Sequence, residues 1–355
     1  MADGSRHSLA MVAESTYGTT PSTPTWTALR HTNCNLGLNK GSFQSEELRS
    51  DRNITDFRHS AKSVNNGFDF ELSYGSFDDA VEALLGGTWA DRGTITGTTI
   101  SAAAADNSYN DSGNGFVTAG FEVGDTVTVT GFTGDVANNI SSGVITALTA
   151  GKMTIGGTDG DVIVDDAAGE SVTIVSAADR VKNGTTRRSW TIERIFADLD
   201  SGEYPYHRFT GCEFSTMELT LPADGKVTGT FGVAGQTLSL DTAEVASATY
   251  SAATTTAMMD SFTGTLKEGG SEIAIVTEAS ISVDNGMAPR FVVGDNKTIQ
   301  SSIARCNVTG NVTVYFEDAT MYNKFLNETE SSLDITLDDP SGNTHRIYLP
   351  RVKYM

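Results

Sequence analysis

The regular alternation of apolar and polar residues is the feature of this sequence that most limits the folds open to it. From Phe68 to Tyr74 apolar and polar side chains alternate, which gives a strand one buried face and one solvated face. Further segments are predicted strands from their alternation or their β-branched and aromatic content: residues 190–196, 217–221, 278–283, 308–316, 333–337 and 347–349. This pattern predicts a mainly β chain.

Two stretches have helical spacing instead. In residues 76–85, Ser76 and Asp79 form a Ser-x-x-Asp capping box ahead of an apolar stripe, and two glycines end the segment. Residues 318–327 carry apolar side chains at the same spacing. Each segment follows an alternating strand that a glycine opens. We therefore predict a strand–helix unit that is used twice within one β domain.

Composition separates the middle of the chain from its flanks. Residues 93–178 contain ten acidic residues and one basic residue, a net charge of −9, and no Pro, Trp, Cys or His. Residues 101–115 are predicted to be flexible. The short predicted strands of this part are residues 121–131, 144–148, 153–155, 162–164 and 172–175.

These observations predict a small inserted all-β domain at 93–178. Its two ends are expected to lie close together, because an insertion leaves the host domain to close around it. The host is predicted to be a β-sandwich-like or barrel-like domain with one or two short flanking helices. Its two parts are residues 1–92 and residues 179–355.

The charge and the cysteines exclude several classes of protein. With 24 basic and 45 acidic residues the net charge is −21, which disfavours binding to nucleic acid phosphates or to an anionic membrane. No apolar run approaches the length of a membrane span, and the start of the sequence has no apolar segment typical of a secretion signal. The cysteines are predicted to be free thiols, with Cys212 and Cys306 buried and Cys34 the most reactive.

No motif of a catalytic or metal site is present. The sequence has no HExxH, GxSxG or P-loop pattern, and its five histidines are scattered. Acidic residues gather at Asp159, Asp161, Asp165 and Asp166, but their spacing is not that of an EF-hand loop. We assign no catalytic residue, no cofactor-binding residue and no metal ligand, and we predict that the chain is not an enzyme.

Residues 46–52 form a run of mixed charge near the start of the chain, where few segments show strand or helix periodicity. It can be a solvated surface loop, or an arm that docks on another chain and uses its arginines for bidentate pairing with carboxylates. On the second interpretation the arm, residues 36–62, becomes ordered only against a neighbouring subunit. The candidate subunit-interface residues are Glu46, Glu47, Arg49, Asp51 and Arg52.

Specific residues at both ends of the chain resemble a known family. Near the start they are Glu14-Ser-Thr-Tyr-Gly-Thr19, Trp26 followed by Leu29-Arg30, and Glu47-Leu-Arg-Ser-Asp-Arg52. Near the end they are Val283-Asp-Asn-Gly286, Val308-Thr-Gly310, Tyr315-Phe-Glu-Asp318 and Leu349-Pro-Arg351. In this order they resemble the major tail tube proteins of long-tailed bacteriophages. The acidic stretch 93–178 lies outside the shared pattern.

The resemblance implies a β-sandwich-like subunit with a flanking helix that assembles into hexameric rings, which stack into a tube. It also implies a place in the virion tail, with assembly in the host cytoplasm. The implied partners are further copies of the chain, the tail terminator, tape measure and distal tail proteins, and viral DNA that passes through without specific binding. The acidic composition agrees with such a lumen, because an acidic lining repels phosphates.

Two other classes of function remain open on the sequence. A secreted adhesin or surface-layer protein shares the acidic, Gly- and Thr-rich β composition, but it needs an export route. A glycan-processing enzyme with paired carboxylates needs an aromatic-lined cleft. The chain has only three tryptophans, Trp26, Trp89 and Trp190, and they are far apart in sequence.

Overall fold

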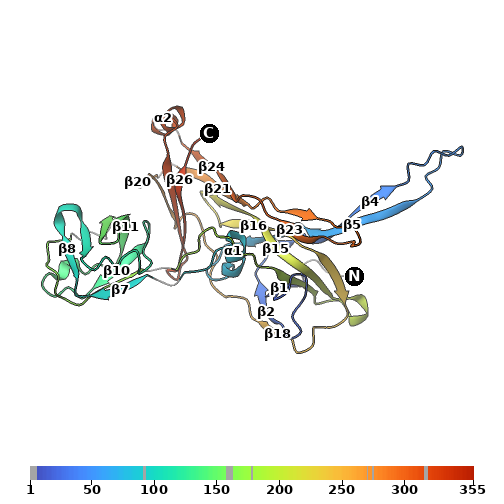
Figure 1. Cartoon of the computed structure of the whole chain (residues 1–355), viewed down its shortest axis with the longest axis horizontal. Coiled ribbons are helices and arrows are strands. Elements are labelled where there is room, and N and C mark those ends of the chain that lie inside the picture. Colours follow the sequence, from blue (N-terminus) through green and yellow to red (C-terminus); the bar gives the residue numbers. More distant parts are fainter. Residues whose placement is uncertain are drawn as a thin grey trace. The chain divides into compact units, whose positions relative to one another are not determined.

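The computed structural model describes residues 6–90, 93–156, 163–176, 179–269, 271–273, 276–315 and 319–355. The chain divides into two compact units. We call residues 1–87 and 183–355 the host unit and residues 88–182 the inserted unit. Strands make up most of the regular structure in both units, which confirms the prediction of a mainly β protein (Figure 1).

The largest sheet belongs to the host unit, and its described strands number eleven. Their order is β18-β2-β1-β14-β15-β16-β6-β3, with β17 and β21 also on β15, and β24 on β21. All pairs are antiparallel except β18 with β2. The bounds are β1 His7–Ala13, β2 Thr25–Leu29, β3 Asn33–Cys34, β6 Gly67–Glu71, β14 Trp190–Phe196, β15 Tyr206–Pro222, β16 Thr228–Ala234, β17 Thr237–Asp241, β18 Thr249–Ser251, β21 Val276–Asp284 and β24 Asn307–Val314.

Strand β15 joins two groups of strands. Its first half pairs with β14 and β17, and its second half pairs with β16 and β21. A register shift between Phe214 and Thr216 marks the change from one group to the other. The long strand therefore runs through both parts of the host sheet (Figure 1).

Aromatic side chains fill the host core where the sequence alternates. Phe68 and Phe70 on β6 point to the same face and are each 1% exposed. The ring of Phe70 stacks on that of Phe231 at 4.7 Å between centroids and lies 4.4 Å from that of Phe77. Burying a side chain of this size contributes about 1.5–3 kcal/mol, so this cluster holds β6, β16 and the segment before the first helix together.

The remaining host elements are a second sheet, two ribbons and two helices, and an isolated turn of 3-10 helix, η3 (Ser201–Glu203). The second sheet has the described order β20-β19-β25-β26. Its strands are β19 Thr265–Glu268, β20 Ser271–Glu272, β25 Ser331–Asp338 and β26 Thr344–Val352. One ribbon pairs β4 (Gly37–Gln44) with β5 (Phe57–Asn65), and the other pairs β22 (Ala288–Arg290) with β23 (Ile299–Ser302).

The helices differ from the prediction at their starts. Helix α1 spans Asp78–Leu85 and has Phe77 at its N-cap, with no side-chain capping bond. The predicted capping box is therefore wrong: the Ser76 hydroxyl is instead hydrogen-bonded to that of Ser73, at 2.7 Å. Helix α2 spans Thr320–Leu326, and the predicted first residue, Asp318, lies outside the described residues. Each helix follows a strand, β6 or β24, as the twice-used unit predicted.

The inserted unit has its own sheet and core. The described strand order is β7-β13-β10-β11-β12-β9-β8, around buried side chains that include Tyr109 and Phe132. Two short 3-10 turns, η1 (Ala104–Asp106) and η2 (Val136–Asn138), lie between its strands. Its strands are β7 Thr94–Gly97, β8 Ile100–Ala103, β9 Ser108–Asp111, β10 Thr126–Thr130, β11 Gly143–Leu148, β12 Lys152–Gly156 and β13 Val172–Ser176.

Two predictions about the inserted unit need correction, and one is confirmed. Residues 101–115 are not a flexible tract, because most of β8 and all of β9 lie there and Tyr109 is fully buried. Of the predicted strand 162–164, residue 162 lies outside the described residues and the other two are not in a strand. The two ends do meet, since the Ala90 N–H donates to the Arg180 carbonyl at 2.8 Å.

The cysteines are free, but their exposure differs from the prediction. Cys34 and Cys212 are buried, whereas Cys306 is half-buried. Cys34 is therefore not the most reactive thiol; it lies in β3, and burial raises its pKa. No described group of three or more His, Cys, Asp or Glu side chains could hold a metal ion. No helix in the described part of the chain is long and apolar enough to cross a membrane.

Candidate assembly surfaces

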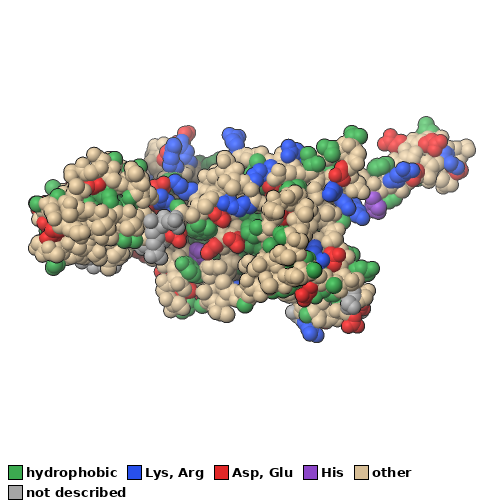
Figure 2. Space-filling model, turned by 60° about the horizontal axis from the view of Figure 1, so that its bottom comes forward, with side chains coloured by type: hydrophobic (Ala, Val, Ile, Leu, Met, Phe, Trp, Pro, Cys, Tyr) green, Lys and Arg blue, Asp and Glu red, His purple; other side chains and the backbone are tan. Residues whose placement is uncertain are grey.

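The predicted interface residues lie at the tip of the β4–β5 ribbon, which we call the arm. The two strands pair with each other from Gly37 opposite Asn65 to Gln44 opposite Phe57. The expectation that the arm becomes ordered only against another subunit is therefore wrong for these strands. All five candidates, Glu46, Glu47, Arg49, Asp51 and Arg52, are exposed in the loop between them. In Figure 2 the arm carries both acidic and basic side chains.

The charges of the loop are partly satisfied within it. Arg49 donates from Nε and Nη2 to the two carboxylate oxygens of Asp51, both at 3.0 Å. These hydrogen bonds hold the pKa of the Asp51 carboxyl below its usual value. The Arg49 fork is thus already occupied in the single chain. Within the described residues no ion pair involves Glu46, Glu47 or Arg52, so these charges face solvent.

Exposed apolar side chains of the arm were missed by sequence reasoning. They are Phe43, Leu48, Ile54 and Phe57, which are 57%, 99%, 60% and 60% exposed. Phe43 lies opposite Arg58 and Phe57 lies opposite Gln44, so the two aromatic rings are on opposite faces of the ribbon. A two-stranded ribbon with apolar groups on both faces has marginal stability in water. Contacts on both faces would bury these groups.

The base of the arm is fixed to the host unit by backbone hydrogen bonds. The Lys62 N–H donates to the Asn296 carbonyl at 2.9 Å, and the Thr298 N–H donates to the Lys62 carbonyl at 3.0 Å. On the other side, Val64 and Gly235 exchange two bonds of 2.9 Å. The arm is therefore held between the β22–β23 ribbon and the end of β16.

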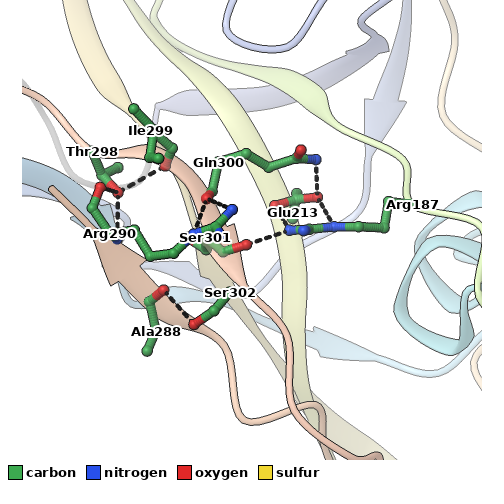
Figure 3. A network of polar contacts seen from close by, with 9 residues as sticks. All are labelled: Arg187, Glu213, Ala288, Arg290, Thr298, Ile299, Gln300, Ser301 and Ser302. Atoms are coloured by element: carbon green, nitrogen blue, oxygen red, sulfur yellow. Dashed lines mark hydrogen bonds and ion pairs between the residues drawn. The ribbon is translucent and has the colours of Figure 1, made fainter. Parts of the chain in front are cut away.

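A buried ion pair anchors the β22–β23 ribbon in turn (Figure 3). Arg187 donates to both carboxylate oxygens of Glu213 on β15, at 2.9 and 2.6 Å, and to the Ser301 carbonyl at 2.8 Å. Gln300 also donates to Glu213, at 3.0 Å. Glu213 is 2% exposed, so removal of Arg187 would leave a buried charge unpaired at a cost of about 3–5 kcal/mol.

Strand β24 is an unprotected sheet edge. Among the described strands it pairs with β21 alone, along its whole length. Its sequence, Asn-Val-Thr-Gly-Asn-Val-Thr-Val, has neither a charged residue nor a proline, and six of its eight residues are exposed. Edge strands usually carry charges, prolines or bulges that prevent another strand from adding. Strand β24 itself carries none of them, since the register shift in its pairing lies on β21, between Val276 and Glu278. Its outer edge can therefore pair with another chain.

Helix α2, the next element after β24 in the sequence, has an exposed apolar surface. No residue of α2, all of which the structure describes, is buried. Tyr322, Phe325 and Leu326 are 59%, 44% and 58% exposed. Tyr315, just after β24, is 70% exposed. A concentration of large apolar groups of this kind marks an interaction surface.

Comparison with known proteins gives the family. A family model described as phage tail tube protein matches residues 4–99 and 159–351. This chain belongs to that family. A search of curated proteins found no significant match to this chain. The tail tube match covers almost all of both parts of the host unit, and its gap falls within the inserted unit.

Membership identifies this tail tube protein as a structural component of the virion tail. Trp26 and Trp190 of the host unit are buried, so they do not line the open cleft that the glycan-processing alternative needs. In the inserted unit a hollow is lined by small and polar residues, among them Asp111, Asp165 and Asp166, with no aromatic side chain. The surfaces that need an explanation are therefore the arm, the β24 edge and α2.

Proposed function

We propose that this tail tube protein assembles into stacked rings of six tail tube folds whose central channel conducts the phage DNA. The unprotected β24 edge is the observation that carries the proposal. An uncharged, mostly exposed edge is an aggregation hazard in a monomer, and it ceases to be one when a neighbour pairs with it. Around a closed ring every such edge is covered, whereas an open chain always leaves one exposed.

The arm supplies contacts between one ring and the next. It is attached at its base and exposed along its length, so it can reach a second subunit without unfolding the first. A partner subunit would bury the apolar side chains on both faces of the arm. It could also form ion pairs with the charged loop. Stacking of rings in one direction is a head-to-tail contact, which generates an open-ended tube.

The net charge favours transport of DNA without binding. Duplex DNA carries about one negative charge per 1.7 Å of its length, and proteins that hold it neutralise phosphates with Lys and Arg. A chain of net charge −21 that lines a channel repels the phosphates, and the duplex can slide. We place the inserted unit on the outside of the tube, because several copies of it would obstruct the channel.

The remaining partners and locations follow from the same assembly. Ends of the tube would meet the tail terminator and distal tail proteins, and the tape measure protein would occupy the channel before DNA does. Assembly would take place in the host cytoplasm. Each of these contacts is part of the proposal and follows from the implied architecture.

The proposal is tested by negative-stain microscopy of the purified chain, in which rings or open tubes are expected. Asn311→Lys places a charge on the β24 edge and should prevent assembly while the chain stays folded. Thr94→Lys is the matched control, because Thr94 is an exposed threonine on β7, an edge strand of the inserted unit. If Asn311→Lys still forms tubes, the edge is not the ring contact.

The arm is tested separately. Deletion of residues 41–58 should abolish tube growth and leave a folded chain. Replacing Arg49 and Arg52 by Glu should weaken assembly more at low salt than at high salt, since screening is strong beyond about 10 Å at 0.1 M. Normal tubes from the deletion variant would show that the arm has no part in stacking.

A further inference from the structure

We propose that the host unit contains the tail tube fold twice, so that three chains, and not six, supply the six folds of a ring. The internal duplication is argued from the topology of the chain. The number of chains per ring rests on the proposed function as well. We call residues 7–85 with 190–222 repeat 1, and residues 265–352 repeat 2.

The two repeats contain the same elements in the same order. Repeat 1 runs β1, β2, β3, the β4–β5 ribbon, β6, α1, β14 and β15. Repeat 2 runs β19, β20, β21, the β22–β23 ribbon, β24, α2, β25 and β26. Each repeat is therefore three strands, a ribbon, a strand, a helix and two strands.

The pairing of the strands is also the same. In repeat 1 the order is β2-β1-β14-β15, and in repeat 2 it is β20-β19-β25-β26, with every pair antiparallel. The strands on either side of each ribbon pair with each other, β3 with β6 and β21 with β24. Many topologies are possible for this number of strands, so agreement of all these pairs is strong support for a duplication.

Local features repeat as well. A glycine lies in the strand before each helix, Gly67 in β6 and Gly310 in β24. The two glycines face different neighbours, because a Cβ at Gly67 would collide with the Phe231 carbonyl on β16 and a Cβ at Gly310 with the Ser280 carbonyl on β21. An asparagine follows the strand before each ribbon, Asn35 after β3 and Asn285 after β21.

Within one chain, repeat 2 pairs with β15 of repeat 1 and contacts the end of helix α1. The second half of β15 pairs with β21 from Thr216 opposite Asp284 to Pro222 opposite Glu278. Asn285 is 3% exposed, and its Nδ2 donates to the Leu84 carbonyl at the end of α1, at 2.7 Å. This bond satisfies one of the carbonyls that every helix leaves free at its C-terminus. Repeat 2 is thus the neighbour that completes repeat 1.

In the part of the single chain that the structure describes, no element plays this part for repeat 2. Its helix, α2, is exposed, and β26, the counterpart of β15, pairs with β25 alone among the described strands. The unpaired edge of β24 corresponds to the edge of β6 that β16 covers, and β16 belongs to neither repeat. The equivalent neighbour is repeat 1 of a second copy, in which Asn35 is exposed and occupies the place that Asn285 has in repeat 2. Around the ring, the contact between the two repeats of one chain then alternates with the contact between neighbouring chains. Three chains form a closed ring of six folds.

The repeats are similar and not identical. The inserted unit interrupts repeat 1 alone. Strands β16, β17 and β18 follow repeat 1, whereas the described residues after β26 form no strand. The ring would therefore have exact threefold symmetry and approximate sixfold symmetry. Because each chain has one inserted unit, the number of inserted units in a ring equals the number of chains.

The test is a count of chains in assemblies of the full-length protein, by native mass spectrometry of rings and by cryo-electron microscopy of tubes. We expect three chains and three inserted units per ring, with six similar folds around the channel. Rings of six chains and six inserted units would overturn the inference and leave the proposed function intact. A chain that forms neither rings nor tubes would overturn both.

Discussion

The two helices of the host unit occupy the same place in the topology and have opposite surroundings. On α1, Ala80 and Leu84 are 0% and 2% exposed. On α2, Phe325 and Leu326 are 44% and 58% exposed. Helix α1 packs on β15 and ends against Asn285, both outside the strand–helix unit itself. The comparison teaches that the same place in the topology does not ensure burial of a helix's apolar face, which depends on what packs against it.

The two ribbons also differ in their surroundings, but here the element of repeat 1 is the exposed one. The arm of repeat 1 is exposed to its tip, whereas the β22–β23 ribbon of repeat 2 is anchored on β15 through Arg187 and Glu213. Each repeat thus keeps one element secured within the chain and presents the other to solvent. Such a chain exposes one element on repeat 1, the arm, and a different one on repeat 2, helix α2. Two different exposed surfaces on one chain are what head-to-tail assembly requires.

The largest expected effect comes from making the exposed face of α2 polar. Phe325→Ser combined with Leu326→Ser should abolish rings and tubes and leave the thermal unfolding of the free chain almost unchanged, because both side chains are already in solvent. Val136→Ser is the control, since Val136 is 70% exposed on the inserted unit. Microscopy measures assembly and circular dichroism measures unfolding. Normal tubes from the double variant would show that no neighbour covers α2.

A matched pair of leucines sharpens the comparison within the free chain. Leu84→Ala should lower the free energy of unfolding by about 2–5 kcal/mol, because it leaves a cavity in a packed core. Leu326→Ala should change it by no more than about 0.5 kcal/mol, as exposed substitutions do. Urea denaturation of both variants measures the difference. Equal losses would mean that α2 is buried in solution and that the two helices do not differ.

Much of the fold could be predicted because half-buried strands alternate. The pattern identified β6, β14, the second half of β15, β21, β24, β25 and β26. It missed other strands, among them β1, in which Leu9, Ala10 and Met11 are buried in succession between two neighbouring strands. A strand covered on both faces does not alternate. The Ala- and Asn-rich tract at 101–115 was misjudged from composition, although Tyr109 gives it a buried anchor.

The candidate surfaces could be predicted only in part. Charge patterning directed attention to the arm loop and located all five residues there. It did not find the exposed apolar groups of the arm or of α2, because a sequence shows which side chains are apolar and not which of them lack a neighbour. The duplication was visible as a twice-used strand–helix unit. Its full extent needed the strand pairing, which the sequence does not show.

The contact between the repeats can be weakened by a single substitution. Asn285→Ala removes the hydrogen bond to the Leu84 carbonyl and leaves that buried acceptor unsatisfied, which costs about 1–3 kcal/mol. The loss should appear in urea denaturation and as faster amide exchange in the last turn of α1. The control is Asn311→Ala, at an exposed position of β24. An unchanged α1 in Asn285→Ala would show that repeat 2 does not complete repeat 1.

The smallest expected effect is a change in the reactivity of one thiol. Cys306 directly precedes β24 and is half-buried, while Cys34 and Cys212 are buried. Burial and then the charge of Asp284 raise the pKa of Cys306, so its alkylation should be slow near neutral pH and faster as the pH rises. In the free chain iodoacetamide should modify Cys306 first, and Cys306→Ser should remove this reaction. In tubes the rate should fall, because a neighbour on the β24 edge covers the start of that strand. Equal rates in free chains and tubes would place the contact between chains away from β24, and the comparison of the two helices would then need another neighbour.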